Sequence, residues 1–151
     1  MTMDKSIAVG ADHAGFELKT HLVEHLKENS YDVLDVGTDS DESVDYPEYA
    51  AKVAEAVSCG RVERGLLVCG SGLGVAIAAN KVDGVRAVTA NTVELARLSR
   101  RHNDANILAI GARIVEPGAA QEILDGWLDT KYEGGRHQRR VDKITKLENR
   151  K

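Results

Sequence analysis

The sequence predicts a doubly wound α/β fold, in which helices cover both faces of a five-stranded parallel sheet. Short β-rich apolar runs alternate with longer helical patterns five times along the chain. The runs are almost continuously apolar, which is typical of strands buried on both faces of a parallel sheet. With 151 residues there is room for one hydrophobic core, so we expect one Rossmann-like domain over residues 1–151.

Each element follows from a local pattern. The strands are short apolar runs that end near a glycine or a turn, and we expect them at 6–9, 31–36, 65–68, 85–88 and 107–110. The helices have apolar residues recurring every three or four positions, and we expect them at 16–26, 46–57, about 75–80, 93–98 and 117–128. Pro47 and Pro117 each stand where a helix should begin, as first-turn prolines do.

A last segment, about 136–151, predicts an extra C-terminal helix. Val141, Ile144 and Leu147 are spaced three apart and give it a thin apolar stripe. Seven basic residues against two acidic ones give this segment a net charge of +5, so the first 135 residues carry −9 of the total of −4. The five strand–helix units already complete a core. This helix therefore packs either against another subunit or back onto its own domain.

Composition argues against several classes of protein. Apolar stretches such as Val75–Ala79 are far shorter than the about 18 residues that a membrane span needs, and the first residues lack the apolar region of an export signal. Two cysteines are too few for a disulfide framework or a zinc site. Aromatic residues make up only 4%, so surfaces for stacking bases are scarce. We expect a cytoplasmic protein that binds neither membranes nor nucleic acid.

The loops after the first and third strands are where chemistry is expected. In an open parallel sheet, ligands bind beyond the carboxyl ends of the strands, at the point where the strand order reverses. If the order is the common 2-1-3-4-5, the first and third strands are neighbours at this point. Asp12, His13 and Cys69 would then face one crevice.

The loop after the third strand, Cys69–Gly74, has two interpretations. It reads G-x-G-x-G, and Val75 stands where the dinucleotide-binding fingerprint needs its third glycine. The glycines either allow a tight turn or present backbone N–H groups to a phosphate or an oxyanion. A free cysteine is most often a small buried apolar residue. At a helix N-terminus, however, Cys69 could serve as a nucleophile or a general base.

Histidine and arginine residues give further candidates. His21 and His25 lie one helical turn apart without a carboxylate or cysteine at ligand spacing, so we interpret them as a solvated face and expect no metal site. His102 follows two arginines and could simply end a helix. Arg136 and Arg140 are four apart and would project together from a helix, which suits a phosphate.

Taken together, these motifs resemble the family of type B ribose-5-phosphate isomerases, which includes the galactose-6-phosphate isomerase subunits. The resemblance covers essentially the full chain, and the motifs occur in the order of the family. They are Gly10–Lys19, Asp45–Pro47, Cys69–Gly74 with Ala79–Lys81, His102–Asn106 with Gly111–Arg113, and Glu133–Arg140.

The resemblance implies the catalytic residues. Cys69 matches the general base, which moves a proton between C1 and C2 of the open-chain sugar. Some members use a Glu at the end of the glycine loop instead, where this chain has Val75. The resemblance therefore implies that this chain belongs with the members whose base is a cysteine. Ser71 stands where many members have Thr and keeps a hydroxyl for the enediolate. His102 matches the residue that opens the furanose ring, and Asn103 the one that steadies the intermediate.

The resemblance also implies how substrate is held. The matching positions are Asp12 and Tyr46 for sugar hydroxyls, Gly70, Gly72, Leu73 and Gly74 for the enediolate oxygens, and His13, Arg113, Arg136 and Arg140 for the phosphate. In the family this site lies at a dimer interface and draws on both chains. We therefore expect a homodimer, or a tetramer built from it, with the C-terminal helix at the interface.

The function implied is interconversion of D-ribose 5-phosphate and D-ribulose 5-phosphate in the pentose phosphate pathway, without a metal or an organic cofactor. One alternative is isomerisation of a six-carbon sugar phosphate, such as allose 6-phosphate or galactose 6-phosphate. A second is a noncatalytic Rossmann-type module that binds a nucleotide or phosphate. A third is a nucleic-acid-binding domain that uses the basic tail.

Overall fold

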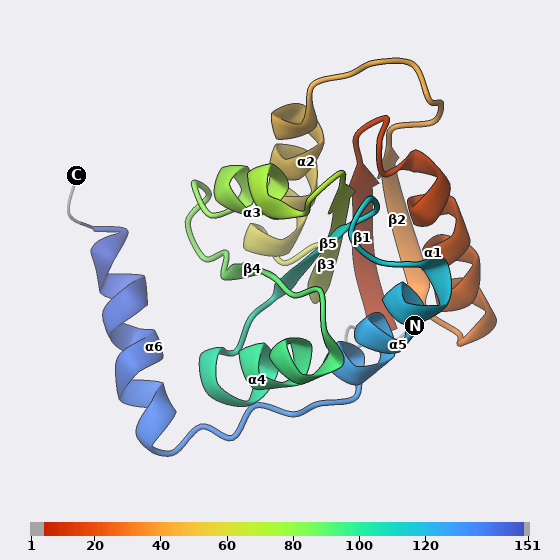
Figure 1. The fold of residues 1–151 in the computed structure, drawn as a ribbon. Helices are drawn as coiled ribbons and strands as arrows, with labels where there is room; N and C mark the ends of the chain where they lie inside the picture. Colours follow the sequence, from red (N-terminus) through yellow and green to blue (C-terminus); the bar gives the residue numbers. More distant parts are fainter. Residues whose placement is uncertain (1–4, 150–151) are drawn as a thin grey trace.

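The computed structural model describes residues 5–149 and confirms the α/β fold (Figure 1). The strands of its sheet are β1 (Ser6–Ala11), β2 (Asp32–Gly37), β3 (Arg64–Cys69), β4 (Ala87–Thr89) and β5 (Ile107–Gly111). The helices are α1 (Phe16–Glu28), α2 (Tyr46–Ser58), α3 (Leu73–Ala79), α4 (Val93–Asn103), α5 (Pro117–Leu128) and α6 (Arg136–Leu147). All the strand pairs are parallel.

The strand order differs from the common one at one edge of the sheet. It is β2-β1-β3-β5-β4, so β5 and not β4 lies beside β3. Every residue of β5 is buried, whereas β4 has three residues and is only partly buried. A fully buried strand needs hydrogen-bond partners on both sides, and a short, half-exposed strand can take the edge. The expected adjacency of β1 and β3 is present.

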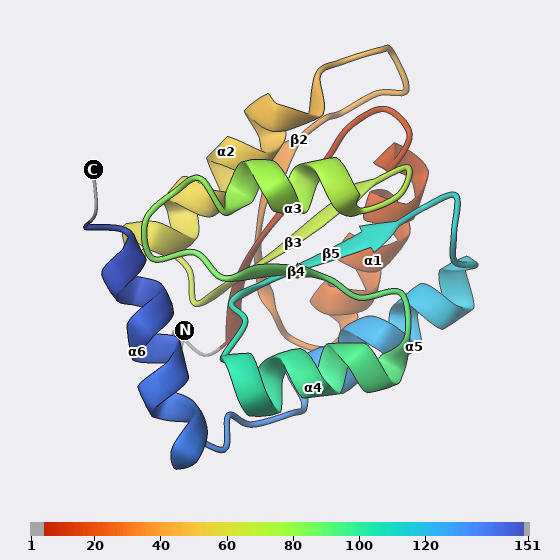
Figure 2. The ribbon, with the colours of Figure 1, turned by 60° about the vertical axis from the view of Figure 1, so that its left-hand side comes forward.

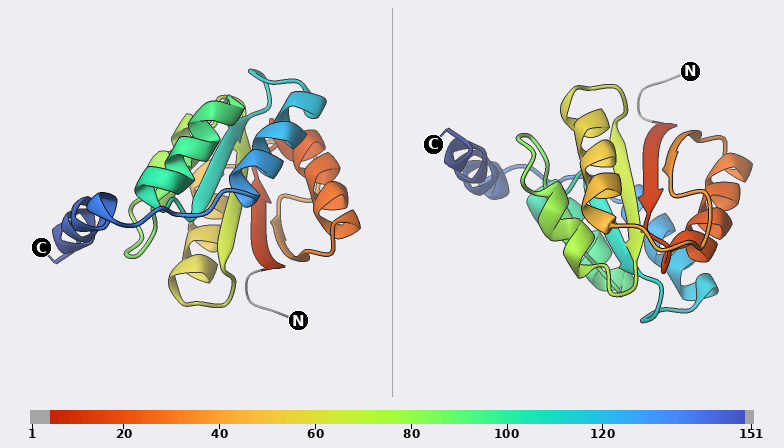
Figure 3. Two further views of the ribbon diagram at one scale, coloured as in Figure 1. Left: turned by 90° about the horizontal axis from the view of Figure 1, so that it is seen from below. Right: turned by 90° about the horizontal axis from the view of Figure 1, so that it is seen from above.

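Two helical layers cover the sheet (Figure 3). One core lies between the sheet and α1, α4 and α5, and contains Ile7, Val9 and the fully buried Trp127. The other lies between the sheet and α2 and α3, and contains the alternate residue Ala8. Right-handed crossovers require this division, because the chain changes face whenever it reverses its direction across the sheet. No helix within residues 5–149 is long and apolar enough to cross a bilayer.

The fourth strand was expected at 85–88 but occupies Ala87–Thr89. Side chains from other segments form hydrogen bonds with the backbone groups at its start. The Arg86 amide donates to Asn106 Oδ1 at 2.7 Å. The Ala87 amide donates to Asn80 Oδ1 at 2.8 Å, and Asn80 Nδ2 donates to the Ala87 carbonyl at 2.9 Å. The asparagine amide thus completes the free edge of the sheet at Ala87.

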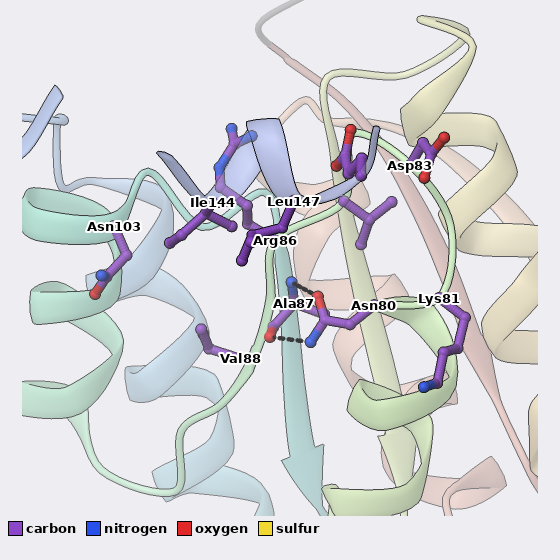
Figure 4. A pocket seen from close by; sticks show the side chains of 11 residues that line it. Asn80, Lys81, Asp83, Arg86, Ala87, Val88, Asn103, Ile144 and Leu147 are labelled. Atoms are coloured by element: carbon purple, nitrogen blue, oxygen red, sulfur yellow. Dashed lines mark hydrogen bonds between the residues drawn. The ribbon is translucent and has the colours of Figure 1, made fainter. Parts of the chain in front are cut away.

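The extra helix α6 is present and stands to one side of the two layers (Figures 1 and 2). His137 and Val141 are buried near its start. Farther along, Ile144 and Leu147 are 46% and 57% exposed and line a pocket of about 500 Å³ with residues 80–88 (Figure 4). Beyond them, Glu148 Oε1 accepts from the Gly84 amide at 2.7 Å. The helix therefore touches its own domain but leaves apolar side chains uncovered.

Candidate active site

A pocket of about 430 Å³ opens at the carboxyl ends of β1 and β3, where the strand order reverses. Its lining residues are Asp12, Tyr46, Cys69, Gly70, Ser71, Gly74, Arg113 and Ile114. All of these except Ile114 are site residues predicted from the sequence. The adjacency of β1 and β3 brings them together, because their loops leave the same edge of the sheet.

Cys69 is the last residue of β3 and is buried. Its carbonyl accepts from the Ala112 amide at 2.8 Å, which fixes the end of the strand against the chain beyond β5. Its Sγ accepts a hydrogen bond from the Gly72 amide at 3.2 Å. Gly72 has a φ of +79°, and glycine adopts this left-handed conformation without steric strain. The loop thus folds back over the thiol and places a backbone donor on the sulfur.

Two glycines of the loop lie in close contact with larger side chains. A β-carbon on Gly74 would lie 2.5 Å from Cζ of Tyr46, and one on Gly70 would lie 3.1 Å from Nη1 of Arg113. The Tyr46 ring and the Arg113 guanidinium therefore pack directly on the loop backbone. This contact brings a phenol hydroxyl and a positive charge to the rim of the pocket.

Ser71 and Asp12 present polar groups in the same pocket. Ser71 Oγ accepts from the Leu73 amide at 3.2 Å, so its own O–H remains able to donate to a ligand. The Leu73 side chain is 58% exposed, and its link to the site is through its backbone. Asp12 is buried, and its Oδ1 accepts from the Gly15 amide at 3.0 Å. This bond orients the carboxylate and leaves its other lone pairs able to accept hydrogen bonds from a ligand.

His13 follows Asp12 and has a defined tautomer. Its Nδ1 accepts from the Val44 amide at 3.1 Å. In the neutral ring the proton therefore sits on Nε2, where it can be donated to an anion. The same bond ties the loop before α2 to the end of β1.

The structure does not bring His102, Asn103, Arg136 and Arg140 to this pocket. Cys69 pairs with Gly111 at the end of β5, whereas α4 ends at Asn103, just before β5 begins. The five residues of β5 span about 16 Å. His102 and Asn103 therefore lie at the opposite end of the sheet, and Arg136 and Arg140 lie there too because His137 of the same helix stacks on His102. One chain presents two separate groups of the predicted residues.

The second group has its own geometry. The half-buried His102 ring stacks on His137, with ring centroids 4.3 Å apart and planes 15° apart. Burial lowers the pKa of His137 below its usual value, and the nearby His102 and Arg136 lower it further, while Glu133 opposes them. Asn103, Arg136 and Arg140 are exposed.

Ile114, Glu133 and His137 were not predicted as individual site positions. Glu133 and His137 do lie within the last of the motifs. Their spacing of four residues does not signal a contact, because Glu133 precedes α6, which begins at Arg136.

The chain matches known proteins along nearly its whole length. A family model described as Ribose/Galactose Isomerase matches residues 7–144. The chain is 52% identical to ribose-5-phosphate isomerase B of Escherichia coli, over 97% of this chain and 99% of that protein. A structure of ribose-5-phosphate isomerase B from Clostridium thermocellum superposes with a TM-score of 0.94 at 50% identity, covering 95% of this chain and 97% of the other.

A second solved structure carries a ligand. It is ribose-5-phosphate isomerase B from Mycoplasma genitalium with bound ribulose 5-phosphate. It matches with a TM-score of 0.93 and 40% identity over 97% of both chains.

Proposed function

The chain belongs to the ribose/galactose isomerase family, and we propose that it is an aldose–ketose isomerase that interconverts D-ribose 5-phosphate and D-ribulose 5-phosphate. The observation that carries the proposal is Cys69, buried at the end of β3 beneath a glycine loop whose amide contacts its sulfur. A base held beside backbone donors suits proton transfer next to a carbonyl.

The chemistry assigned to the pocket is a proton transfer through an enediolate. The Cys69 thiolate removes the proton from C2 of the open-chain aldose, and negative charge develops on the C1 oxygen. Ser71 and the amides of the loop donate to the enediolate oxygens. The thiol then returns a proton to C1, and the proton of the C2 hydroxyl passes to the C1 oxygen, which gives the ketose. These steps move protons only and need no redox cofactor.

The remaining polar residues bind the substrate. Asp12 and Tyr46 contact sugar hydroxyls. His13 and Arg113 contribute to the phosphate pocket from the same chain, and both lie on loops at the carboxyl ends of strands. A phosphate held away from the reacting carbons lets its binding energy position the sugar.

A homodimer would complete the site. The group of His102, Asn103, Arg136 and Arg140 lies at the opposite end of the sheet from Cys69, so it cannot act on the same substrate within one chain. A two-fold axis can bring this group from one protomer to the Cys69 pocket of its partner, so that the dimer has two equivalent complete sites. His102 then opens the furanose ring, and the two arginines bind the phosphate.

Exposed apolar side chains support this assembly. Leu73 and Ile77 project from α3 beside the pocket and are 58% and 63% exposed. On α6, Ile144 and Leu147 are uncovered as well. Such apolar surface, near the two groups of site residues, is typical of an interface. Cys59 and Cys69 are both free, which favours a reducing, cytoplasmic setting for a thiol that must stay reactive.

The test is NMR of the purified protein with ribose 5-phosphate in D₂O containing EDTA. We expect ribulose 5-phosphate to appear, with deuterium from solvent at C1 or C2. Allose 6-phosphate and galactose 6-phosphate are run in parallel, and we expect slower turnover. A folded, dimeric sample that converts only a six-carbon substrate would reassign the substrate, and one that converts none would favour a binding module.

A further inference from the structure

Three side chains that can bind a metal ion meet where α6 begins. They are His102 at the end of α4, Glu133 in the connecting segment and His137 on α6. One ligand atom from each lies within 4.8 Å of the others. His137 Nε2 is 3.7 Å from Glu133 Oε1, and the His137 ring stacks on that of His102.

Backbone contacts hold this cluster together. The Glu133 amide donates to the Arg101 carbonyl at 3.0 Å, which anchors Glu133 to the residue before His102. The chain then turns through Gly134 and Gly135, both with positive φ. The His137 amide donates to the Gly134 carbonyl at 3.0 Å and starts the helix. The end of α4, the segment that connects α5 to α6 and the start of α6 therefore converge on one point.

We propose that His102, Glu133 and His137 form a binding site for a zinc-like transition-metal dication. Two imidazoles and one carboxylate, with a fourth position left to water, form a ligand set that zinc uses. Magnesium and calcium prefer oxygen ligands throughout, so they are disfavoured.

The geometry needs a small adjustment to bind an ion. Zinc–nitrogen bonds of about 2.0 Å place tetrahedral ligands about 3.3 Å apart. The 3.7 Å between His137 and Glu133 is already close to that spacing. His102 is only half-buried and can rotate to complete the set. The nearby Arg136 and Arg140 repel a dication and Glu133 attracts it, so the site favours ions that bond strongly to imidazole nitrogen.

The site has a consequence that rests on the proposed function. A metal ion bonded to His102 occupies a ring nitrogen that ring opening requires for proton transfer. The ion is therefore an inhibitor of the isomerase with the cyclic substrate and has no part in turnover.

Binding is measured first, without reference to activity. The EDTA-treated, dialysed full-length protein is titrated with Zn²⁺ against a chromophoric chelator and, separately, with Co²⁺ for its visible spectrum. We expect one ion per chain and cobalt bands without the sulfur-to-metal charge transfer that a site at Cys59 or Cys69 would give. Glu133→Gln and His137→Asn weaken binding by about tenfold or more. His21→Gln, which alters a histidine on α1, is the matched control and leaves binding unchanged.

Two results would overturn the site: equal affinity in wild type, Glu133→Gln and His137→Asn, or a cobalt spectrum that shows thiolate ligation. Glu133 is exposed, so its variant is expected to fold, and circular dichroism checks this. Activity is measured second. Zn²⁺ inhibits the wild type with ribose 5-phosphate, EDTA reverses the inhibition, and Glu133→Gln resists it. Binding without inhibition would overturn the inhibitory role, whereas failure of the untreated enzyme to convert ribose 5-phosphate would overturn the proposed function.

Discussion

The Gly72 amide donates a hydrogen bond of 3.2 Å to Cys69 Sγ, and the Gly72 carbonyl accepts one of 2.6 Å from Thr89 Oγ1. The peptide groups on both sides of Gly72 are thus engaged, one by the sulfur and the other by β4. The glycine loop and the thiol form one structural unit. Because Thr89 holds the Gly72 carbonyl independently of the sulfur, a change at the sulfur should alter the chemistry without rearranging the loop.

Cys69→Ala should abolish turnover of ribose 5-phosphate and leave binding of ribulose 5-phosphate largely intact. The substitution removes the proposed base, whereas the groups assigned to the phosphate and the hydroxyls remain. Turnover is measured by NMR in D₂O and binding by calorimetry. Cys69→Ser is the matched variant: it keeps a hydrogen-bonding group of similar size, but its hydroxyl ionises too poorly to replace the thiolate. Normal turnover in either variant would remove Cys69 from the role of base.

Gly74→Ala should weaken the enzyme through Tyr46. The added methyl group would lie 2.5 Å from Tyr46 Cζ, so the ring, which is 40% exposed, must swing out of the pocket. We expect kcat/KM to fall about tenfold, which corresponds to about one lost hydrogen bond. Tyr46→Ala should cost a similar factor, and the double variant no more than either single one. Additive losses would mean that Gly74 contacts the substrate itself.

The fold was largely predictable because local patterns decide most of it. Apolar runs and helical spacing located the strands and helices that the structure describes within residues 5–149, and α6 was expected from three apolar residues on a basic segment. The order of β4 and β5 was not predictable in this way. It depends on which strand can form hydrogen bonds along both of its edges. It also depends on the Asn80 side chain, which bonds to the backbone of Ala87 and closes the outer edge of β4.

The candidate site also contains residues whose positions were predictable from the sequence and residues whose positions were not. The residues that follow β1 and β3 were expected to meet because parallel strands end at one edge of the sheet, and Asp12 and Cys69 line one pocket. The position of His102 away from that pocket follows from the length of β5 and from the end of α4. Contacts between segments such as that of His102 with His137 arise from packing, which local sequence patterns do not describe.

The ion pair between the buried Lys19 and the exposed Asp35 predicts an asymmetric effect on stability. Lys19 Nζ lies 2.8 Å from Asp35 Oδ2, and the side chains are 4% and 38% exposed. Asp35→Asn leaves a buried ammonium without its charge partner and should lower the free energy of unfolding by about 2 kcal/mol, less than for a fully buried pair because water reaches Asp35. Lys19→Met removes the buried charge and leaves a carboxylate that water can reach, so it should cost about 1 kcal/mol. Urea denaturation of both variants measures the difference, and equal losses would contradict the explanation.

His102→Ala should separate ring opening from proton transfer. Ribose 5-phosphate is mostly a furanose, whereas ribulose 5-phosphate stays open-chain because its C5 oxygen carries the phosphate. We expect turnover of ribose 5-phosphate to fall by about 100-fold or more. Exchange of deuterium from D₂O into ribulose 5-phosphate should fall much less, because that exchange needs only Cys69 and the loop. Equal losses in the two measurements would contradict the ring-opening role.

Mixing two inactive variants tests whether the site is shared between chains. In a dimer of Cys69→Ala with His102→Ala, one pocket lacks both groups, but the other combines an intact Cys69 with an intact His102 from the partner. Random assembly after joint refolding makes about half of the dimers mixed, so about a quarter of the wild-type turnover of ribose 5-phosphate should return. Each variant refolded alone is the control and should remain inactive. Because one chain keeps Cys69 and His102 at opposite ends of its sheet, a mixture that recovers no turnover, although native mass spectrometry shows mixed dimers, would contradict the shared site.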